Sequence, residues 1–339
     1  MLRFAVLGLG FMGRTHLATL AARPQAEIRA VHDSDPQRLT RPLAPGGGNI
    51  ETGAAGWDES AVRRCQTLEE ILNDEDIDAV VVATPSHLHA RLSCAALAAG
   101  KHVFCEKPMA LKLADCDRML AAAGKAGRTL MIGHCIRFWG EYAAAAEIVR
   151  SGRFGRLQLL TMSRRCGVPT FGARGWFTDH KKSGGALLDL HIHDVDYALY
   201  LLGPPRSVRA RGLRGPSGGY DQVLSWYDYG RAGPVVQLEG GWSAGEDIPF
   251  VMSFRMCLER ATLVYAMDKR PTLWLYSDSA EELQAPAVSG YEAEMDHFIR
   301  CIRSGKPSRV VPPESSRQSV ALALAEAQAI RSGRAVEIH

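Results

Sequence analysis

The chain has 339 residues, which at roughly 150 residues per domain predicts two domains. Hydrophobic residues make up 46% and charged residues 23%, values that exclude a disordered, collagenous or coiled-coil chain. The 40 Lys and Arg and 37 Asp and Glu residues leave a formal net charge of +3 without blocks of one sign. We therefore expect no binding to nucleic acid or to a membrane, and no apolar segment approaches the roughly 18 residues of a membrane helix.

The first residues and the cysteines indicate the compartment. After three residues the chain enters a strand-like segment at residues 4–8, without a hydrophobic segment of signal-peptide length. The eight cysteines are scattered and form no Cys-x-x-Cys pair. In an unsecreted chain we expect reduced thiols that pack as small apolar residues. The sequence therefore predicts a cytoplasmic protein.

Short apolar segments rich in β-branched residues alternate with helical segments through the first 135 residues. Strands connected by helical crossovers form a parallel sheet, whose two covered faces explain the uninterrupted apolar strands. Strands are predicted at residues 3–7, 27–31, 79–83, 102–105 and 129–132, and helices at 13–22, 68–73, 87–99 and 113–126.

The turn after the first predicted strand has the spacing Gly-x-Gly-x-x-Gly. Glycines at this spacing suit a tight turn, close approach of a pyrophosphate and close packing of the helix on the strand. The phosphates would lie at the amino end of the next helix, where free N–H groups and the helix dipole favour anions. Because an acidic residue follows twenty residues on, the pattern predicts an α/β Rossmann dinucleotide-binding domain, which we place at residues 1–127. The predicted contacts of this turn are Gly8, Gly10, Phe11, Met12 and Gly13.

Asp33 ends the second predicted strand, where a carboxylate can accept hydrogen bonds from both ribose hydroxyls of NAD. It would repel the 2′-phosphate of NADP, and the next residue, Ser34, carries no charge that pairs with that phosphate. We expect NAD, although Arg38 leaves NADP open. The alternative is that Asp33 only forms a turn. Residues 43–56, rich in glycine, are predicted to form a flexible surface loop without an assigned role.

The second half of the chain has a different pattern, with alternating strands separated by Gly and Pro turns. This pattern predicts an α+β domain with a large, mostly antiparallel open sheet at residues 128–339. We expect the helix at 315–332 to pack back on the first domain. Strands are predicted at residues 156–165, 206–212, 223–229, 235–242, 249–256, 261–265 and 273–276, and helices at 186–202, 291–303 and 315–332.

Two further segments carry recognisable motifs: Glu-Lys-Pro at residues 106–108, and Gly-Gly-Ala-Leu-Leu-Asp-Leu-His-Ile-His-Asp-Val-Asp at 184–196. With the glycine turn and Ala-Thr-Pro-Ser-His-Leu-His at 83–89, they resemble the glucose–fructose oxidoreductase, inositol dehydrogenase and rhizopine-catabolism (Gfo/Idh/MocA) family, nearly end to end. The resemblance implies an NAD-dependent dehydrogenase acting on a CH–OH group of a sugar or cyclic polyol. It also implies substrate in a cleft between the domains and a homodimer or homotetramer.

The resemblance also implies roles for single residues. It places Lys107, Asp189 and His193 where a sugar or polyol hydroxyl meets the nicotinamide, with the peptide bond before Pro108 often cis. It further implies four neighbours of the nicotinamide and its ribose and one residue that often reaches the substrate. These are Thr84, Pro85, His87 and Glu106 for the cofactor, and Arg137 for the substrate.

The chemistry of these residues agrees with that reading. Oxidation of an alcohol by hydride transfer needs a base for the hydroxyl proton and positive charge beside the developing alkoxide. A neutral His193 can take the proton near pH 7, and the Lys107 ammonium can stabilise the negative charge, or the two roles can be exchanged. Asp189 lies one helical turn before His193, where it can orient the ring or bind substrate. Alone, such a lysine is usually a surface charge and such a histidine a core residue, but three matching positions favour catalysis.

The His-x-His pattern at residues 191–193 suggests a metal. On a helix, however, His191 would point about 200° away from Asp189, at about 100° per residue, whereas His193 shares the face of Asp189. No other His or carboxylate cluster completes a coordination shell, so we predict no metal site. Many family members have Gly in place of His191, and we expect this residue to affect the substrate's shape. His16 is expected to be a hydrogen-bonded packing residue.

Three residues with lower support, Trp176, Asp179 and Tyr291, are candidate substrate contacts, because aromatic and carboxylate side chains suit a sugar. Each is equally well explained as an ordinary core or surface residue. Two other functions stay open: a glycosidase that retains NAD and acts through transient oxidation at C3, and a non-catalytic sugar- or redox-responsive regulator. An intact set of Lys107, Asp189 and His193 counts against the regulator.

Overall fold

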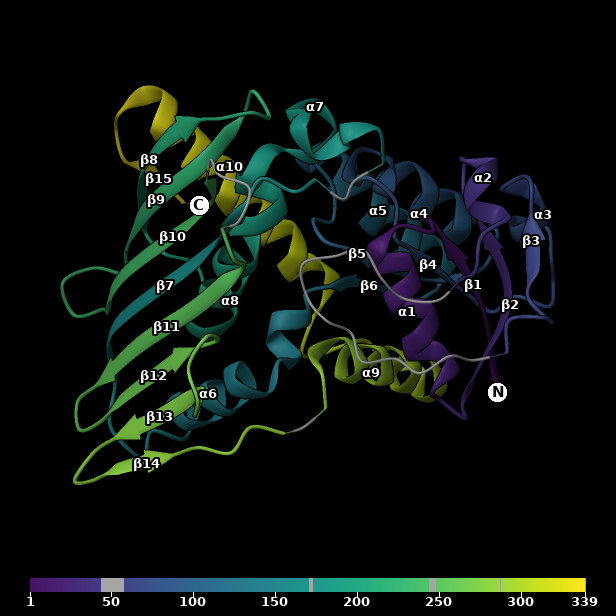
Figure 1. The fold of residues 1–339 in the computed structure, drawn as a ribbon. Helices are drawn as coiled ribbons and strands as arrows, with labels where there is room; N and C mark the ends of the chain where they lie inside the picture. Colours follow the sequence, from purple (N-terminus) through teal and green to yellow (C-terminus); the bar gives the residue numbers. More distant parts are fainter. Residues whose placement is uncertain (44–57, 171–172, 244–247, 287, 339) are drawn as a thin grey trace. The chain divides into compact units, whose positions relative to one another are not determined.

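The computed structural model describes residues 1–43, 58–170, 173–243, 248–286 and 288–338. The chain divides into two compact units (Figure 1). The first comprises Met1–His134, Phe171–Trp176 and Tyr291–Arg317, and the second comprises Cys135–Thr170, Phe177–Gly290 and Gln318–His339. Of the predicted loop at 43–56, all but Leu43 lies outside the described residues.

The first unit is built on a six-stranded sheet with the order β3-β2-β1-β4-β5-β6. Every strand pair in it is parallel, which confirms the predicted Rossmann sheet. All four residues of the central β4 are buried, as expected for a strand covered on both faces. The strands are β1 (Leu2–Leu7), β2 (Ala26–His32), β3 (Arg63–Cys65), β4 (Ala79–Val82), β5 (His102–Glu106) and β6 (Leu130–Gly133).

Helices cover both faces of this sheet (Figure 1). On one face lie α1 (Phe11–Ala21) and α9 (Gly290–Ser304), where Phe298 of α9 packs between Phe4 and Phe104 of the strands. On the other face lie α4 (His89–Ala98) and α5 (Leu113–Ala126). The short helices of this unit are α2 (Pro36–Leu39), α3 (Glu69–Leu72) and η1 (Ser86–Leu88).

The second unit is built on a nine-stranded sheet with the order β14-β13-β12-β11-β7-β10-β9-β8-β15. Its strand pairs are antiparallel except β7 with β10, which confirms the predicted mostly antiparallel sheet. The strands are β7 (Leu157–Gly167), β8 (Ser207–Arg214), β9 (Tyr220–Asp228), β10 (Val235–Ser243), β11 (Val251–Leu258), β12 (Thr262–Ala266), β13 (Leu273–Tyr276), β14 (Ala280–Glu282) and β15 (Val336–Glu337).

One face of this second sheet carries the helices α6 (Gly140–Ser151), α8 (Ile192–Leu202) and the part of α10 (Pro313–Ser332) that belongs to the unit (Figure 1). Side chains of β9 alternate accordingly, with Tyr227 buried and Trp226 exposed. Tyr276 of β13 is likewise exposed. Exposed aromatic side chains on a sheet are typical of a contact between subunits. The expected homo-oligomer stays a prediction.

The two compact units have bounds that differ from the predicted domains, which stay a prediction. The strand β6 pairs with β5, so the first unit extends to His134, and residues 291–317 return to it. The helix α10 spans both units, and near its start Arg317, which belongs to the first unit, pairs with Asp117. Further on, Glu326 of α10 accepts a hydrogen bond from Tyr227 of the second sheet.

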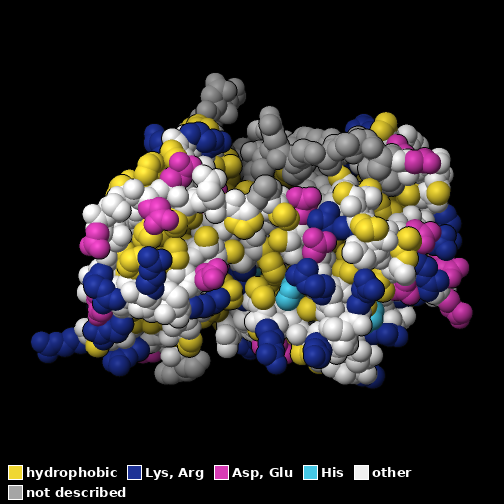
Figure 2. Space-filling view, turned by 90° about the horizontal axis from the view of Figure 1, so that it is seen from below, with side chains coloured by type: hydrophobic (Ala, Val, Ile, Leu, Met, Phe, Trp, Pro, Cys, Tyr) yellow, Lys and Arg dark blue, Asp and Glu magenta, His cyan; other side chains and the backbone are white. Residues whose placement is uncertain are grey.

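On the face of the molecule drawn in Figure 2, lysine and arginine side chains are interspersed with aspartate and glutamate, as the sequence pattern indicates. Among the described residues, none of the helices combines the length and the apolar character that a membrane span requires.

Candidate active site

The first sheet has a point at which its strand order reverses. The chain runs from β1 to β2 on one side and later to β4 on the other side of β1. In open parallel sheets, ligands bind beside the carboxyl ends of the strands at such a point. The predicted cofactor residues follow these ends: Gly8 follows β1, Asp33 follows β2, Thr84 follows β4 and Lys107 follows β5.

The glycine turn after β1 has no room for a side chain at two of its glycines. Gly8 has φ +93°, and a Cβ there would overlap the carbonyl oxygen of Ala83. A Cβ at Gly13 would overlap the carbonyl oxygen of Gly8, because α1 packs directly on the turn. Gly10 caps α1, and because glycine has no side chain, the N-cap residue places no side chain over the helix's first N–H groups. The turn thus fits a pyrophosphate, which these N–H groups and the helix dipole would hold.

Asp33 connects the end of β2 to the glycine turn. Its Oδ2 accepts the N–H of Leu9 at 2.7 Å, and its Oδ1 accepts the N–H of Asp35 at 2.8 Å. Arg38 Nη1 lies 3.4 Å from Oδ2 and 3.6 Å from the place of a Cβ on Gly10. Asp33 therefore forms a turn, and Arg38 lies beside both its carboxylate and the glycine turn. Their contacts with a dinucleotide stay predictions. Ser34 is exposed.

His89, a residue without an assigned role in the sequence analysis, joins two of the predicted cofactor loops. Its Nε2 lies 2.8 Å from the carbonyl oxygen of Thr84, and its Nδ1 lies 2.8 Å from that of Pro108. Burial lowers the pKa of His89 below 6.5 despite these two bonds. The sequence signal for His89 is its place as the last residue of the motif at 83–89, and in the structure it begins α4.

The Glu-Lys-Pro segment begins at the last residue of β5. Glu106 is buried, and its Oε1 lies 2.7 Å from Nε2 of His16, which confirms that His16 is a hydrogen-bonded packing residue. Its Oε2 accepts the backbone N–H of Lys107 at 3.2 Å. The Lys107–Pro108 peptide bond is cis, as the family resemblance implies. Lys107 itself is half-buried.

Asp189 and His193 lie in the second unit, at a change of helix type. The π-helix η4 (Leu187–His191) carries Asp189, and α8 begins next and carries His193 in its first turn. The expected uninterrupted α-helix at 186–202 is therefore wrong in its first part, and the angle of 100° per residue does not apply there. Single π turns within helices occur frequently at functional sites. Asp189 is 8% exposed and His193 is half-buried.

Two buried ion pairs fix the start of α8, just after His193. Asp194 binds Arg164 of β7 at 2.8 Å, and both side chains are at most 2% exposed. Asp196 binds Arg137 of η2 (Cys135–Phe138) at 2.6 Å and accepts a second bond from Ser319 of α10 at 2.7 Å. Because each carboxylate reaches a different element, the position of His193 in the second unit is fixed by contacts of its neighbours.

The four candidate substrate contacts outside the Lys107, Asp189 and His193 set have different surroundings. The guanidinium of Arg137 is bound to Asp196 and buried, so its geometry supports a structural role. Tyr291 is buried against the edge of His16. Asp179 begins α7 (His180–Ser183), and hydrogen bonds, first from Lys182, lower its pKa. Trp176 is half-buried in η3 (Ala173–Thr178). Their contacts with substrate stay predictions.

His191 belongs to the interior of the second unit. Its Nε2 lies 3.1 Å from Glu326 of α10, and Tyr227 of β9 donates to the same carboxylate at 2.7 Å. A Cβ on Gly240 of β10 would overlap the His191 ring. The expectation that His191 affects the substrate's shape is not supported by this position, because the side chain is fully buried against α10 and the sheet.

The His191–Glu326 pair predicts a pH-dependent stability. Burial alone would lower the pKa of His191, but the charge and hydrogen bond of Glu326 outweigh burial and raise it above 6.5. A raised pKa stabilises the fold fully below the unfolded value of 6.5, and this contribution is lost as pH rises through the folded value. We expect His191→Gln to lower the melting temperature more at pH 6 than at pH 8.5. Tyr227→Phe removes a hydroxyl that stays protonated in this range, so it should lower the melting temperature equally at both pH values. If Tyr227→Phe showed the same pH trend as His191→Gln, the assignment would be contradicted.

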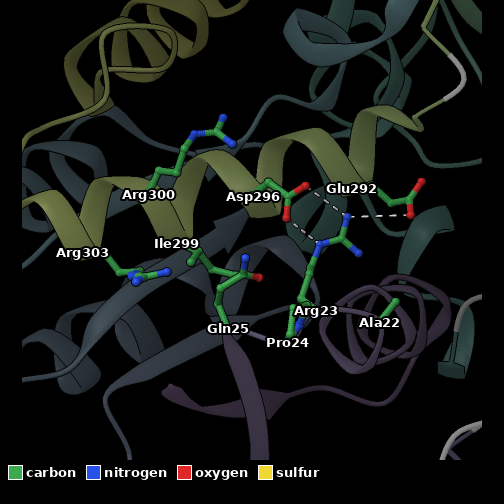
Figure 3. Close-up of a pocket in the computed structure, with 9 residues that line it drawn as sticks. All are labelled: Ala22, Arg23, Pro24, Gln25, Glu292, Asp296, Ile299, Arg300 and Arg303. Carbon is green, nitrogen blue, oxygen red and sulfur yellow. Dashed lines mark hydrogen bonds and ion pairs between the residues drawn. The ribbon is translucent and has the colours of Figure 1, made fainter.

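A pocket of about 460 Å³ lies elsewhere in the first unit, between the end of α1 and α9 (Figure 3). Arg23 crosses it to bind Asp296 at 2.8 Å and Glu292 at 3.7 Å. The Ala22–Gln25 connection that lines it leads into β2, so the pocket lies at the amino edge of the sheet. Dinucleotides bind at the opposite, carboxyl edge, and we assign this pocket no role.

The glycine turn at the switch point of a parallel sheet, followed by a second unit with an open sheet, defines a dinucleotide-binding oxidoreductase. The comparison with family models agrees. Residues 2–134 match the oxidoreductase family with an NAD-binding Rossmann fold, GFO_IDH_MocA, and residues 142–264 match the C-terminal domain of the same family. The chain belongs to the GFO/IDH/MocA family of oxidoreductases, and its first unit is an NAD-binding Rossmann domain.

Relatives of the chain match it over different lengths. A 1,5-anhydro-D-fructose reductase of Ensifer adhaerens is 30% identical over 304 residues, which cover 86% of this chain and 89% of that protein. An uncharacterized oxidoreductase of Streptococcus pneumoniae is 30% identical over 62% of this chain, and the match spans about half (53%) of that relative. The crystal structure of an aldose-aldose oxidoreductase from Caulobacter crescentus in complex with glycerol has a TM-score of 0.83 at 25% identity, covering 99% of each chain.

Proposed function

We propose that the protein is an NAD-dependent dehydrogenase that moves a hydride between a carbon of a sugar or cyclic polyol and the nicotinamide. The observation that carries the proposal is the glycine turn, which has no room for a side chain at Gly8 or Gly13 and places a glycine at the start of α1, a geometry that fits a pyrophosphate. The loop of Thr84 lies beside this turn. Family membership and the sugar-directed names of relatives support the substrate class.

In this proposal the protein supplies orientation and proton transfer. Gly8, Gly10 and Gly13 hold the pyrophosphate, and Asp33 binds the adenosine ribose, which favours NAD over NADP. Bound NAD supplies the hydride acceptor. The Lys107 ammonium stabilises the substrate oxygen as it loses its proton, and His193 accepts that proton, with Asp189 binding a substrate hydroxyl or the ring.

The test is a panel of inositols, aldoses and anhydro-sugars, followed by NADH absorbance with NAD and NADP in parallel. We expect at least one cyclic compound to reduce NAD, and NADP to be reduced more slowly. Denatured protein is first analysed for retained cofactor, because the alternative glycosidase would keep its NAD bound. Release of an aglycone without net NADH formation would replace this proposal with the glycosidase. Reduction of neither cofactor by any compound, together with unmeasurable NADH binding, would contradict the proposal.

A further inference from the structure

Three ionisable side chains from separate elements meet in the core of the first unit. They are His16 of α1, Glu106 of β5 and Glu294 of α9, and each is buried. One nitrogen or oxygen atom of each lies within 4.8 Å of the others. We call these residues the buried triad. From the sequence, Glu106 is expected to contact the cofactor and His16 to be a packing residue, whereas no motif points to Glu294.

The two carboxyl groups of the buried triad differ in their hydrogen bonds. Glu106 is bonded at both oxygens, by His16 Nε2 at 2.7 Å and by the N–H of Lys107 at 3.2 Å. Glu294, although fully buried, has no hydrogen bond at either oxygen among the described residues. Aromatic rings of Phe104 and Tyr291 border His16 at 5.0 and 6.5 Å, so the surroundings are apolar. An ionised carboxylate without a partner in such surroundings is strongly disfavoured.

Electrostatics separates the two carboxyl groups. Burial, and then the charge of Glu106, raises the pKa of Glu294 well above 4.5. Burial also opposes ionisation of Glu106, but the hydrogen bond and charge of His16, and then Lys107 and His89, outweigh it and lower the pKa of Glu106. Two neighbouring buried carboxyl groups commonly divide in this way, one ionised and one protonated.

We propose that Glu294 is a neutral carboxylic acid, and that the buried triad holds Glu106 ionised so that Glu106 positions Lys107. His16 donates to Glu106 Oε1, and Glu106 Oε2 fixes the backbone N–H of Lys107. Glu294 fills the remaining space without adding a second negative charge. The role given to Lys107 rests on the proposed function, whereas the protonation of Glu294 does not.

A divalent cation is the other occupant that two carboxylates and an imidazole would suit. The 2.7 Å separation of His16 Nε2 and Glu106 Oε1 is that of a direct hydrogen bond, which a bridging ion would replace. A single proton on Glu294 already removes the repulsion between the carboxylates. The proton is therefore the favoured occupant, and a metal is an outcome that the experiment distinguishes.

The first experiment measures the melting temperature of the cofactor-free protein between pH 5.5 and 7.5. The folded protein keeps a proton on Glu294 that the unfolded chain releases above about pH 4.5, so this group destabilises the fold increasingly as pH rises. Glu294→Gln replaces the neutral acid with a neutral amide of the same shape. We expect the difference in melting temperature, variant minus wild type, to increase by about 3 °C for each unit of rising pH.

The control is Glu292→Gln, two residues earlier on the same helix. Glu292 is 41% exposed and pairs with Arg23, so its substitution should shift the melting temperature by an amount that does not rise with pH. A Glu294→Gln difference that is flat or falls with pH would overturn the neutral acid. So would a wild-type melting temperature that EDTA lowers and Zn²⁺ or Mg²⁺ restores only when Glu294 is present, because that result identifies a metal ligand.

The second experiment separates positioning from packing by rescue at His16. His16→Leu removes the donor to Glu106, whereas His16→Gln places an amide N–H in a similar position. We expect kcat to fall about tenfold in the first variant and to stay within about twofold in the second, when both are assayed well below the melting temperature of the less stable variant. Equal losses in both variants, or no loss in either, would reject the positioning role. An inactive wild type would reject the proposed function, while the pH dependence at Glu294 would still decide the protonation.

Discussion

Lys107→Met is expected to lower kcat by about 10²–10⁴-fold, because it removes the positive charge proposed to stabilise the substrate oxygen. Methionine keeps a long unbranched side chain, so the packing around the half-buried Lys107 changes little. The backbone N–H that binds Glu106 is also kept. The measurement is the initial rate of NADH formation with the best substrate from the panel.

Two control measurements are needed to interpret this result. Lys125→Met, at an exposed position near the end of α5, should leave kcat unchanged. The dissociation constant of NADH, measured by fluorescence, should change only a few-fold in Lys107→Met, because the glycine turn and Asp33 are intact. Full turnover by Lys107→Met would remove Lys107 from the reaction and leave His193 to be tested alone.

Arg164→Met is expected to destabilise the second unit by about 3–5 kcal/mol, because it leaves the Asp194 carboxylate buried without its cation. The Asp194 side chain is 1% exposed and receives two of its bonds, at 2.8 and 3.2 Å, from the Arg164 guanidinium. Denaturant unfolding followed by circular dichroism measures the change.

The chain offers a matched control near the start of the same strand. Arg156 pairs with Glu259 at 3.0 Å, but its side chain is 79% exposed, so Arg156→Met should cost less than about 1 kcal/mol. Replacing both buried partners, in Arg164→Met with Asp194→Leu, should recover part of the loss because no buried charge remains. A cost for Arg164→Met as small as that for Arg156→Met would show that the buried pair contributes little.

Local patterns predicted much of the first unit. The glycine turn, the apolar strands and the helices between them depend on contacts within about thirty residues, and the structure confirms the parallel sheet they form. The prediction missed β3, because Arg63 and Arg64 interrupt the apolar pattern of a three-residue edge strand. It also missed α6, whose residues 143–146 are all alanine and show no contrast between polar and apolar faces.

The rest of the candidate site depends on partners far apart in the sequence. Nothing near Glu294 indicates that it faces Glu106, and nothing near His191 indicates Glu326. The π turn around Asp189 is a change of backbone hydrogen-bond register, and the helix-forming residues around it, mostly Ala and Leu, did not indicate it. The motif residues could therefore be named from the sequence, whereas the groups that set their charge and position could not.

The contact between His191 and Gly240 makes these two positions interdependent. The imidazole occupies the volume that any larger residue at 240 would need, so a side chain can be introduced on that strand only after the ring has been removed. A library that varies residue 240 alone would yield few folded proteins, whereas simultaneous exchange, with a small residue at 191 and alanine or serine at 240, opens a route to a differently packed helix start.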